Sequence, residues 1–214
     1  MTTARQEILG RIRAGLSDVP AAERAEDVPV ARDYRTAGEL TGAALVERFA
    51  ERVRDYQAEV RRVSRDVAAA VGAACAERGL RRVVVPPGLP AEWRPADIEA
   101  VEDDGLTAHQ IDEINGAVTG CALAIAETGT LVLDGQARSG RRLITLVPDH
   151  HVCIVAVDQI VDLVPEAVRA LGPSVREHGV PVTLVSGPSA SSDIELSRVE
   201  GVHGPRQLTV LIAG

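Results

Sequence analysis

The sequence predicts a three-layer α/β domain with a mixed sheet, preceded by an N-terminal helical arm. Short runs rich in Val, Ile and Leu alternate with helical patterns, as in sheets whose strands are connected by helices. Hydrophobic residues make up 45% of the 214 residues, but aromatic residues only 2%. The core must therefore consist of aliphatic side chains, which favours helices packed on a sheet. The length suits one domain over residues 39–214 plus an arm over residues 1–38.

The arm is expected to contain one helix and a linker. Thr3 can cap a helix over residues 3–16, with Gln6 as its capping-box partner. Apolar side chains recur along one side of this helix, namely Ile8, Leu9, Ile12 and Leu16. Residues 17–38 carry prolines and many charges without periodicity, which indicates a linker. We expect the helix to dock through its apolar stripe on its own domain; docking on a partner subunit is the alternative.

The first half of the domain is expected to alternate helices and strands. Residues 39–57 place apolar side chains on one side of a helix. A second helix, rich in small residues, is capped by Ser64 and ends at Gly79. It lies between two short apolar runs, so it forms a βαβ unit and predicts a parallel pair of strands. The remaining elements of this half are strands over 60–63, 82–86 and 98–101 and a helix over 107–114 that Thr107 caps.

The second half of the domain is rich in strands. The runs expected to form them are residues 117–126, 130–133, 143–147, 152–157, 181–185 and 208–212. A helix over 163–171 carries Pro165 in its first turn, where the missing N–H of proline has no consequence. A short helix is expected over 191–196.

The charge of the chain excludes several functions. The formal net charge is −8 and base-stacking aromatic residues are scarce, so nucleic-acid binding is not expected. All 23 basic residues are arginine, which rules out a Schiff-base lysine and a P-loop lysine. Any anion must therefore be held by arginine, by backbone N–H groups or by a helix N-terminus.

The cysteines and histidines do not indicate a metal or a cofactor. Cys75, Cys121 and Cys153 lie far apart in apolar contexts without a C-x-x-C motif, which is typical of reduced core thiols in a cytoplasmic protein. His150 and His151 are adjacent before a strand, where alternation should direct one to the core and one to solvent. No apolar run is long enough for a signal core or a membrane span.

A polar break interrupts an apolar stretch at Glu127-Thr128-Gly129-Thr130. A carboxylate at the end of a buried strand has to be solvated, paired or placed at a cleft, because burying it alone is costly. Gly129 can adopt a positive φ angle, which lets a turn present backbone N–H groups to a ligand. Two interpretations stay open: a substrate-handling element, or a hairpin turn in which Glu127 is solvated.

Three further segments are candidates for one ligand site. Ser186, Gly187, Ser189 and Asp193 follow a predicted strand and suit an anion cradle, or a loop in which Ser or Asp caps a helix. His203, beside Gly204, is the best general acid/base by residue type; the alternative is a structural histidine in a tight turn.

The third segment is the basic loop 135–142. Arg138 and Arg141 are expected to be solvated, whereas Arg142, at the start of the strand over 143–147, is expected to point into a site.

These motifs together resemble the LUD domain family found in lactate utilization protein C. The matching pieces, over roughly residues 107–214, are Ile125–Thr130, Arg142–Pro148 with His151-Val152, Ser186–Ser189 with Asp193–Glu195, and Gly201–Pro205. Ala190 departs from the basic residue expected after Ser189. The resemblance implies a Rossmann-like sandwich of the sugar-phosphate isomerase and CoA-transferase type. It also implies a role in oxidising L-lactate to pyruvate beside two iron–sulfur partner proteins, but no known reaction for this subunit. The sequence itself carries no cofactor motif.

Three functional hypotheses follow. The leading one is a subunit of an L-lactate utilization system; a small anionic ligand is compatible with it. The second is a free-standing enzyme for a small phosphate, CoA thioester or carboxylate, with Glu127 as base or nucleophile and His203 as a second acid/base group. The third is an assembly module with a vestigial cleft. If one site exists, the segments around Glu127, Ser186 and His203 should line one cleft at one edge of the sheet.

Overall fold

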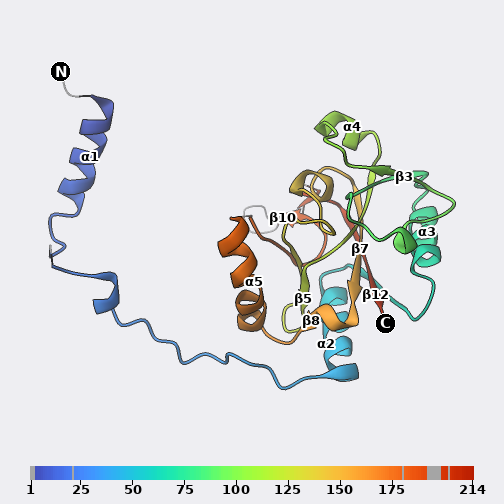
Figure 1. Cartoon of the computed structure of the whole chain (residues 1–214), viewed down its shortest axis with the longest axis horizontal. Coiled ribbons are helices and arrows are strands. Elements are labelled where there is room, and N and C mark those ends of the chain that lie inside the picture. The colour runs from blue at the N-terminus through green and yellow to red at the C-terminus, as the bar shows by residue number, and fades with distance from the viewer. Residues whose placement is uncertain (1–2, 21, 180, 192–198, 202) are drawn as a thin grey trace. The chain divides into compact units, whose positions relative to one another are not determined.

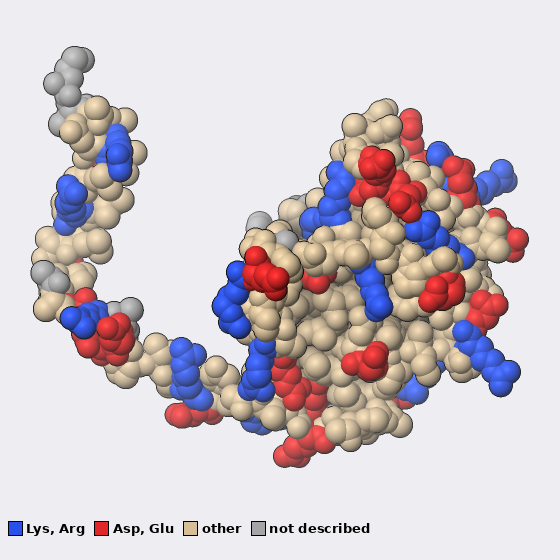
Figure 2. All heavy atoms as spheres, in the orientation of Figure 1, with Lys and Arg blue, Asp and Glu red and all other residues tan. Residues whose placement is uncertain are grey.

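The computed structural model describes residues 3–20, 22–179, 181–191, 199–201 and 203–214. The chain divides into two compact units, Met1–Tyr34 and Arg35–Gly214. Within the described ranges, no helix is long and apolar enough to cross a membrane. On the face of the second unit that Figure 2 shows, acidic and arginine side chains are interspersed and neither sign forms a continuous patch.

The first unit contains helix α1, Ala4–Gly15, and a 3₁₀ helix, Ala25–Asp27. The side chain of Thr3 accepts the N–H of Gln6, and Gln6 reaches back to the N–H of Thr3, so the predicted capping box is present. No residue of α1 is buried within this unit. Where the helix docks therefore stays a prediction.

A six-stranded sheet forms the centre of the second unit (Figure 1). All of its neighbouring strands are parallel. In spatial order the strands are β1 (Glu59–Val63), β12 (Gln207–Ala213), β7 (His150–Ala156), β4 (Gly116–Gly120), β2 (Arg82–Val85) and β3 (Glu99–Glu102). The central sheet is therefore all parallel and not the mixed sheet expected. The antiparallel pairs of the domain lie in other sheets.

Both faces of this sheet are covered. Helix α3, Val67–Glu77, packs on one face, where its Val71 shares a core with Ile154 of β7 and Leu211 of β12. Helix α2, Gly42–Asp55, packs on the other, where its Phe49 shares a core with neighbouring residues of the same two strands. The periodic side chains thus alternate between two buried faces, which confirms the α/β layers.

A second, four-stranded sheet contains the antiparallel pairs. Its strands, in spatial order, are β8 (Ile160–Val161), β5 (Leu123–Ile125), β6 (Thr130–Leu133) and β9 (Thr183–Val185). Helix α5, Val164–His178, packs on it through Ala167. Two further strands of two residues each, β10 (Ala190–Ser191) and β11 (Val199–Glu200), form a short antiparallel pair.

Several predicted elements are wrong in type or extent. The single strand expected over 117–126 is two strands, β4 and β5, because the chain leaves the main sheet at Cys121 and joins the second one. The strand expected over 143–147 is a 3₁₀ helix, Arg142–Thr145. Helix α5 continues past Leu171 through Pro173. The helix expected over 191–196 falls mostly outside the described residues.

The remaining elements are short. Thr107 caps helix α4, Ala108–Asp112, as predicted, and it also forms a capping box with Gln110. Other 3₁₀ helices are Ala91–Trp93 and Val157–Gln159.

The prediction that one of the two adjacent histidines faces solvent is wrong, since His150 and His151 are 3% and 2% exposed. They lie on β7, which is covered on both faces, so alternation only selects between two buried faces. The Nε2 atoms of His150 and His151 lie 2.9 Å and 2.8 Å from the hydroxyls of Thr209 and Thr119. Burial lowers the pKa of His150 to about 4 and that of His151 to about 3.

The neutral His150 should make the protein less stable in mild acid. Its folded pKa of about 4 lies below the ordinary value of 6.5, so the unfolded chain binds more protons between these values. The stability contribution is present above pH 6.5 and is lost as the pH falls through this window. His150→Gln, which keeps a polar side chain beside Thr209, should reduce the pH slope of the unfolding free energy by up to about 1.4 kcal/mol per pH unit. Urea denaturation at pH 7, 6 and 5 measures it.

His109→Gln, at an exposed position, controls for the loss of an imidazole and should keep the wild-type slope. An unchanged slope in His150→Gln would contradict the assignment of a buried neutral imidazole.

Candidate functional site

A cleft of about 220 Å³ lies at the amino ends of β7 and β12 and at the carboxyl end of β9. It is lined by Arg142, Thr145, His151, Leu184, Val185, Ser186, Gly187, Pro188, Ser189, His203, Gly204, Pro205 and Leu208. Doubly wound folds bind ligands at the carboxyl ends of their parallel strands, whereas this cleft lies at the amino ends of β7 and β12. The loop after β9 does follow the carboxyl end of its strand, as expected, but β9 belongs to the second sheet.

The cleft brings together most of the candidate residues predicted from the sequence. Arg142, Ser186, Gly187, Ser189, His203 and Gly204 all line it. Glu127, Thr128, Gly129 and Thr130 are not among the lining residues, but the hydroxyl of Thr130 lies 2.7 Å from that of Ser186, so the two segments are in contact. Asp193 lies outside the described residues.

Arg142 is a half-buried cation without a carboxylate partner among the described residues. Its Nη1 donates to the carbonyl oxygen and the hydroxyl of Thr145, both at 2.9 Å, and these bonds hold it across the 3₁₀ helix that it begins. Burial lowers its pKa. The neighbouring Arg141 differs, because it is exposed and pairs with Asp103. Arg142 is thus the arginine of this loop that lines the cleft, and it lies in a 3₁₀ helix and not at the start of the expected strand.

His151 belongs to the cleft, and sequence analysis did not select it. Its Nε2 atom is hydrogen-bonded to the hydroxyl of Thr119 at 2.8 Å. Its Nδ1 atom has no hydrogen-bond partner in the described part of the chain, and the residue lines the cleft. The signal that could have identified it was a second histidine at the start of an otherwise aliphatic strand. A buried polar ring in such a position needs a partner on each side.

Two loops close the other side of the cleft. Gly187 adopts φ = +82°, and a Cβ atom there would lie 2.5 Å from Cβ of Tyr56, so only glycine fits. The hydroxyl of Ser189 accepts the N–H of His203 at 2.9 Å, and the N–H of Ser189 donates to Pro205 at 2.8 Å. These bonds place the exposed His203 at the rim of the cleft.

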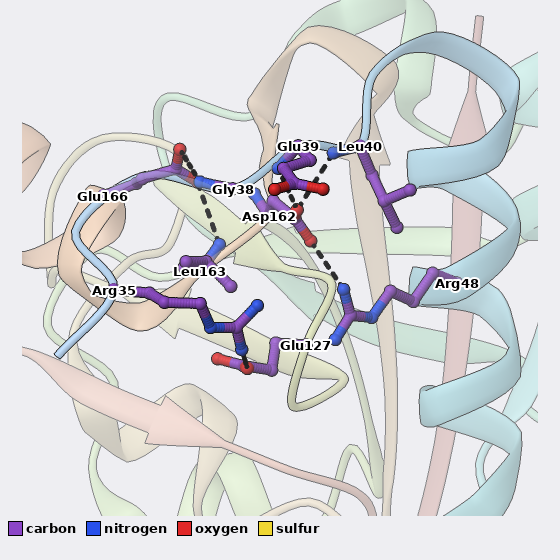
Figure 3. A network of polar contacts seen from close by, with 9 residues as sticks. All are labelled: Arg35, Gly38, Glu39, Leu40, Arg48, Glu127, Asp162, Leu163 and Glu166. Atoms are coloured by element: carbon purple, nitrogen blue, oxygen red, sulfur yellow. Dashed lines mark hydrogen bonds and ion pairs between the residues drawn. The ribbon is translucent and has the colours of Figure 1, made fainter.

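Glu127 lies in the turn of the β5–β6 hairpin, as in one of the two open interpretations, but it is paired and not merely solvated. Its Oε1 accepts Arg35 Nη2 at 2.7 Å, while its side chain stays 30% exposed (Figure 3). Its N–H donates to the carbonyl oxygen of Asp162 at 2.9 Å. A role for Glu127 and His203 as acid/base groups stays a prediction.

Beside this ion pair, two carboxylates hold the segment that enters the domain (Figure 3). Asp162, 5% exposed, accepts the N–H groups of Glu39 and Leu40 on Oδ2 and Nη1 of Arg48 on Oδ1, all within 3.1 Å. Glu166 accepts the N–H of Gly38 on one oxygen and two N–H groups at the start of α5 on the other. We call this arrangement of Asp162 and Glu166 the entry clamp.

The entry clamp was not foreseen from the sequence. Asp162 follows an apolar pair, Ile160-Val161, as a lone acid, and its partners lie more than 110 residues away along the chain. The backbone N–H donors lower the pKa of the Glu166 carboxyl group, and the N–H of Gly38 has the largest effect.

Residues 46–213 match the LUD domain. The chain belongs to the LUD domain family. It is 43% identical over 213 residues to a protein of Deinococcus radiodurans called lactate utilization protein C, and the alignment covers 99% of this chain and 96% of that protein. A protein of the same name from a Geobacillus strain is 29% identical over 64% of this chain and 57% of its own length.

A solved member of the family has the same fold. The crystal structure of a DUF162 family protein from Deinococcus radiodurans is 40% identical and superposes with a TM-score of 0.72. The match covers 82% of this chain and 100% of that chain. The family resemblance seen in the sequence is thus confirmed. In the described parts of this LUD domain, no group of three or more His, Cys, Asp or Glu side chains is arranged to hold a metal.

Gly129 should be required for packing as well as for its turn. It adopts φ = +58°, and a Cβ atom would lie 2.7 Å from the carbonyl carbon of Arg52 in α2. Gly135 also has a positive φ, +70°, but has nothing within 4 Å of a Cβ atom. Gly135→Ala should cost about 1 kcal/mol for the φ angle alone. Gly129→Ala should cost at least about 2 kcal/mol more, because backbone cannot move aside.

Chemical denaturation of the two variants measures this difference. Equal losses would show that the close approach to α2 contributes nothing.

Asp162→Asn should weaken the entry clamp. The amide keeps one acceptor oxygen but places an NH₂ group against backbone N–H donors or Arg48, so we expect a loss of about 2–4 kcal/mol in the free energy of unfolding. Asp55→Asn is the matched control, since Asp55 pairs with Arg52 on the surface, and should cost less than about 1 kcal/mol.

Urea denaturation gives both values, and trypsin cleavage after Arg35 should accelerate only in Asp162→Asn. Similar losses in the two variants would mean that the clamp acts like an ordinary surface pair.

Proposed function

We propose that this LUD protein is a subunit of an L-lactate utilization system and supports the oxidation of L-lactate to pyruvate together with iron–sulfur partner proteins. The observation that carries the proposal is the 43% identity to lactate utilization protein C of Deinococcus radiodurans over nearly the full length of both chains. Relatives that share only a domain would not align over the arm as well, so the similarity includes the segment outside the LUD match.

The chemistry of the chain is compatible with this proposal. Hydride or electron transfer from lactate needs an acceptor, and protein side chains do not supply one. In the proposed system the iron–sulfur partners supply it, and this chain contributes binding and positioning. All three cysteines are free and buried, which suits the cytoplasmic location that belongs to the proposal.

Growth of a deletion strain tests the proposal. Deleting the gene in its own host should abolish growth on L-lactate as sole carbon source and leave growth on pyruvate unchanged, because only the step before pyruvate is lost. The wild-type gene supplied on a plasmid should restore growth. Normal growth of the deletion strain on L-lactate, with no other lactate dehydrogenase present, would contradict the proposal.

Purification of the protein separates this function from that of a free-standing enzyme. A tagged chain should co-purify with iron and acid-labile sulfide from cells grown on L-lactate. Turnover of a small phosphate, CoA thioester or carboxylate by the isolated chain, abolished by Glu127→Gln, would instead support the free-standing enzyme.

A further inference from the structure

We infer that the cleft beside Arg142 binds a short-chain monocarboxylate, with its carboxylate group against the guanidinium and its carbon chain against Val185 and Leu208. The inference deepens the proposed function by naming a ligand class for this chain. It rests on that function only for the choice of L-lactate and pyruvate within the class; the binding itself is argued from the cleft.

The charge of Arg142 calls for an anion. The other arginines with mostly covered side chains, Arg48, Arg61 and Arg94, each pair with a carboxylate within the domain. Arg142 makes only hydrogen bonds to Thr145 among the described residues, and it faces the cleft. A cation that is partly withdrawn from water without a counter-ion is unfavourable, and a bound anion relieves that cost.

Two more groups on the cleft are free to contact such an anion. The N–H of Gly187 has no acceptor among the described residues, and the positive φ of Gly187 sets its direction. Nδ1 of His151 is likewise without a partner, and because the Thr119 hydroxyl can donate to Nε2, this nitrogen can carry the proton. The three groups come from the 3₁₀ helix Arg142–Thr145, from β7 and from the loop after β9, so the fold itself assembles them.

The charge balance favours a monoanion over a dianion. Arg142 is the only Arg, Asp or Glu side chain among the described lining residues, and His151 is kept neutral by burial. One cation balances one carboxylate, whereas a phosphate dianion would leave excess negative charge in a chain that already carries −8.

Size and lining set the length of the carbon chain. About 220 Å³ is less than the usual volume of a drug-sized site, so it suits a ligand of a few heavy atoms. Val185, Pro188 and Leu208 add apolar side chains to the lining, which suits a methyl or ethyl end.

Direct titration of the purified full chain tests the inference. The probes are sodium L-lactate, pyruvate, propionate and inorganic phosphate at constant ionic strength, followed by calorimetry and by NMR. The monocarboxylates should bind saturably, and inorganic phosphate at least about tenfold more weakly. Arg142→Gln should weaken monocarboxylate binding at least about tenfold, the usual effect of losing a charge-assisted hydrogen bond. Arg65→Gln removes an exposed arginine and should leave binding unchanged.

A second measurement avoids dependence on the variants. In the wild-type protein the Gly187 amide and His151 imidazole resonances should shift with the same saturation curve. The inference is overturned if no monocarboxylate saturates the protein below about 50 mM, if phosphate binds as tightly, or if Arg65→Gln weakens binding as much as Arg142→Gln. If the deletion strain grows normally on L-lactate while the purified chain still binds monocarboxylates, the proposed function is overturned and this inference stands.

Discussion

The burial of β7 on both faces is the constraint on which the rest of the structure depends. A strand between two parallel neighbours and under helices on both sides can hold only side chains that are apolar or fully hydrogen-bonded. Val152, Cys153, Ile154 and Val155 meet the first condition. The two histidines at its amino end meet the second only in part: Nε2 of each is hydrogen-bonded to a threonine on the flanking strand β4 or β12, whereas Nδ1 of His150 has no partner among the described residues. The polar end of an otherwise apolar strand thereby becomes the floor of the cleft.

The same constraint explains which parts of the fold could be predicted from the sequence. The aliphatic runs of β1, β2, β6 and β12, the capping box of α1 and the Thr107 cap of α4 depend on nearby residues, and the local pattern identified them. The run over 143–147 is also apolar and rich in strand formers, yet it forms a 3₁₀ helix. There, Arg142 and Thr145 bond to each other across one turn, and Ile144 packs under α4, a contact that no local pattern encodes.

The candidate site divides in the same way. Ser186, Gly187, Ser189, His203 and Gly204 could be selected because glycines and hydroxyls after strands mark places where backbone approaches a ligand or another loop. His151 was missed because its place on the cleft depends on the loops that pack beside β7, which only the packed structure reveals. The position of Glu127 was ambiguous for a similar reason, since its partner Arg35 lies 92 residues away along the chain.

The entry clamp has a consequence for how sequences of this kind can change over time. Three successive backbone N–H groups, from Gly38 to Leu40, meet two carboxylates, that of Asp162 directly after β8 and that of Glu166 in α5. A Cβ atom at Gly38 would lie 2.2 Å from a carboxylate oxygen of Asp162. An inserted or deleted residue here would shift every donor away from its acceptor. We therefore expect changes of chain length between the arm and the domain to fall in the linker ahead of Arg35, while the attachment at residues 38–40 keeps its length.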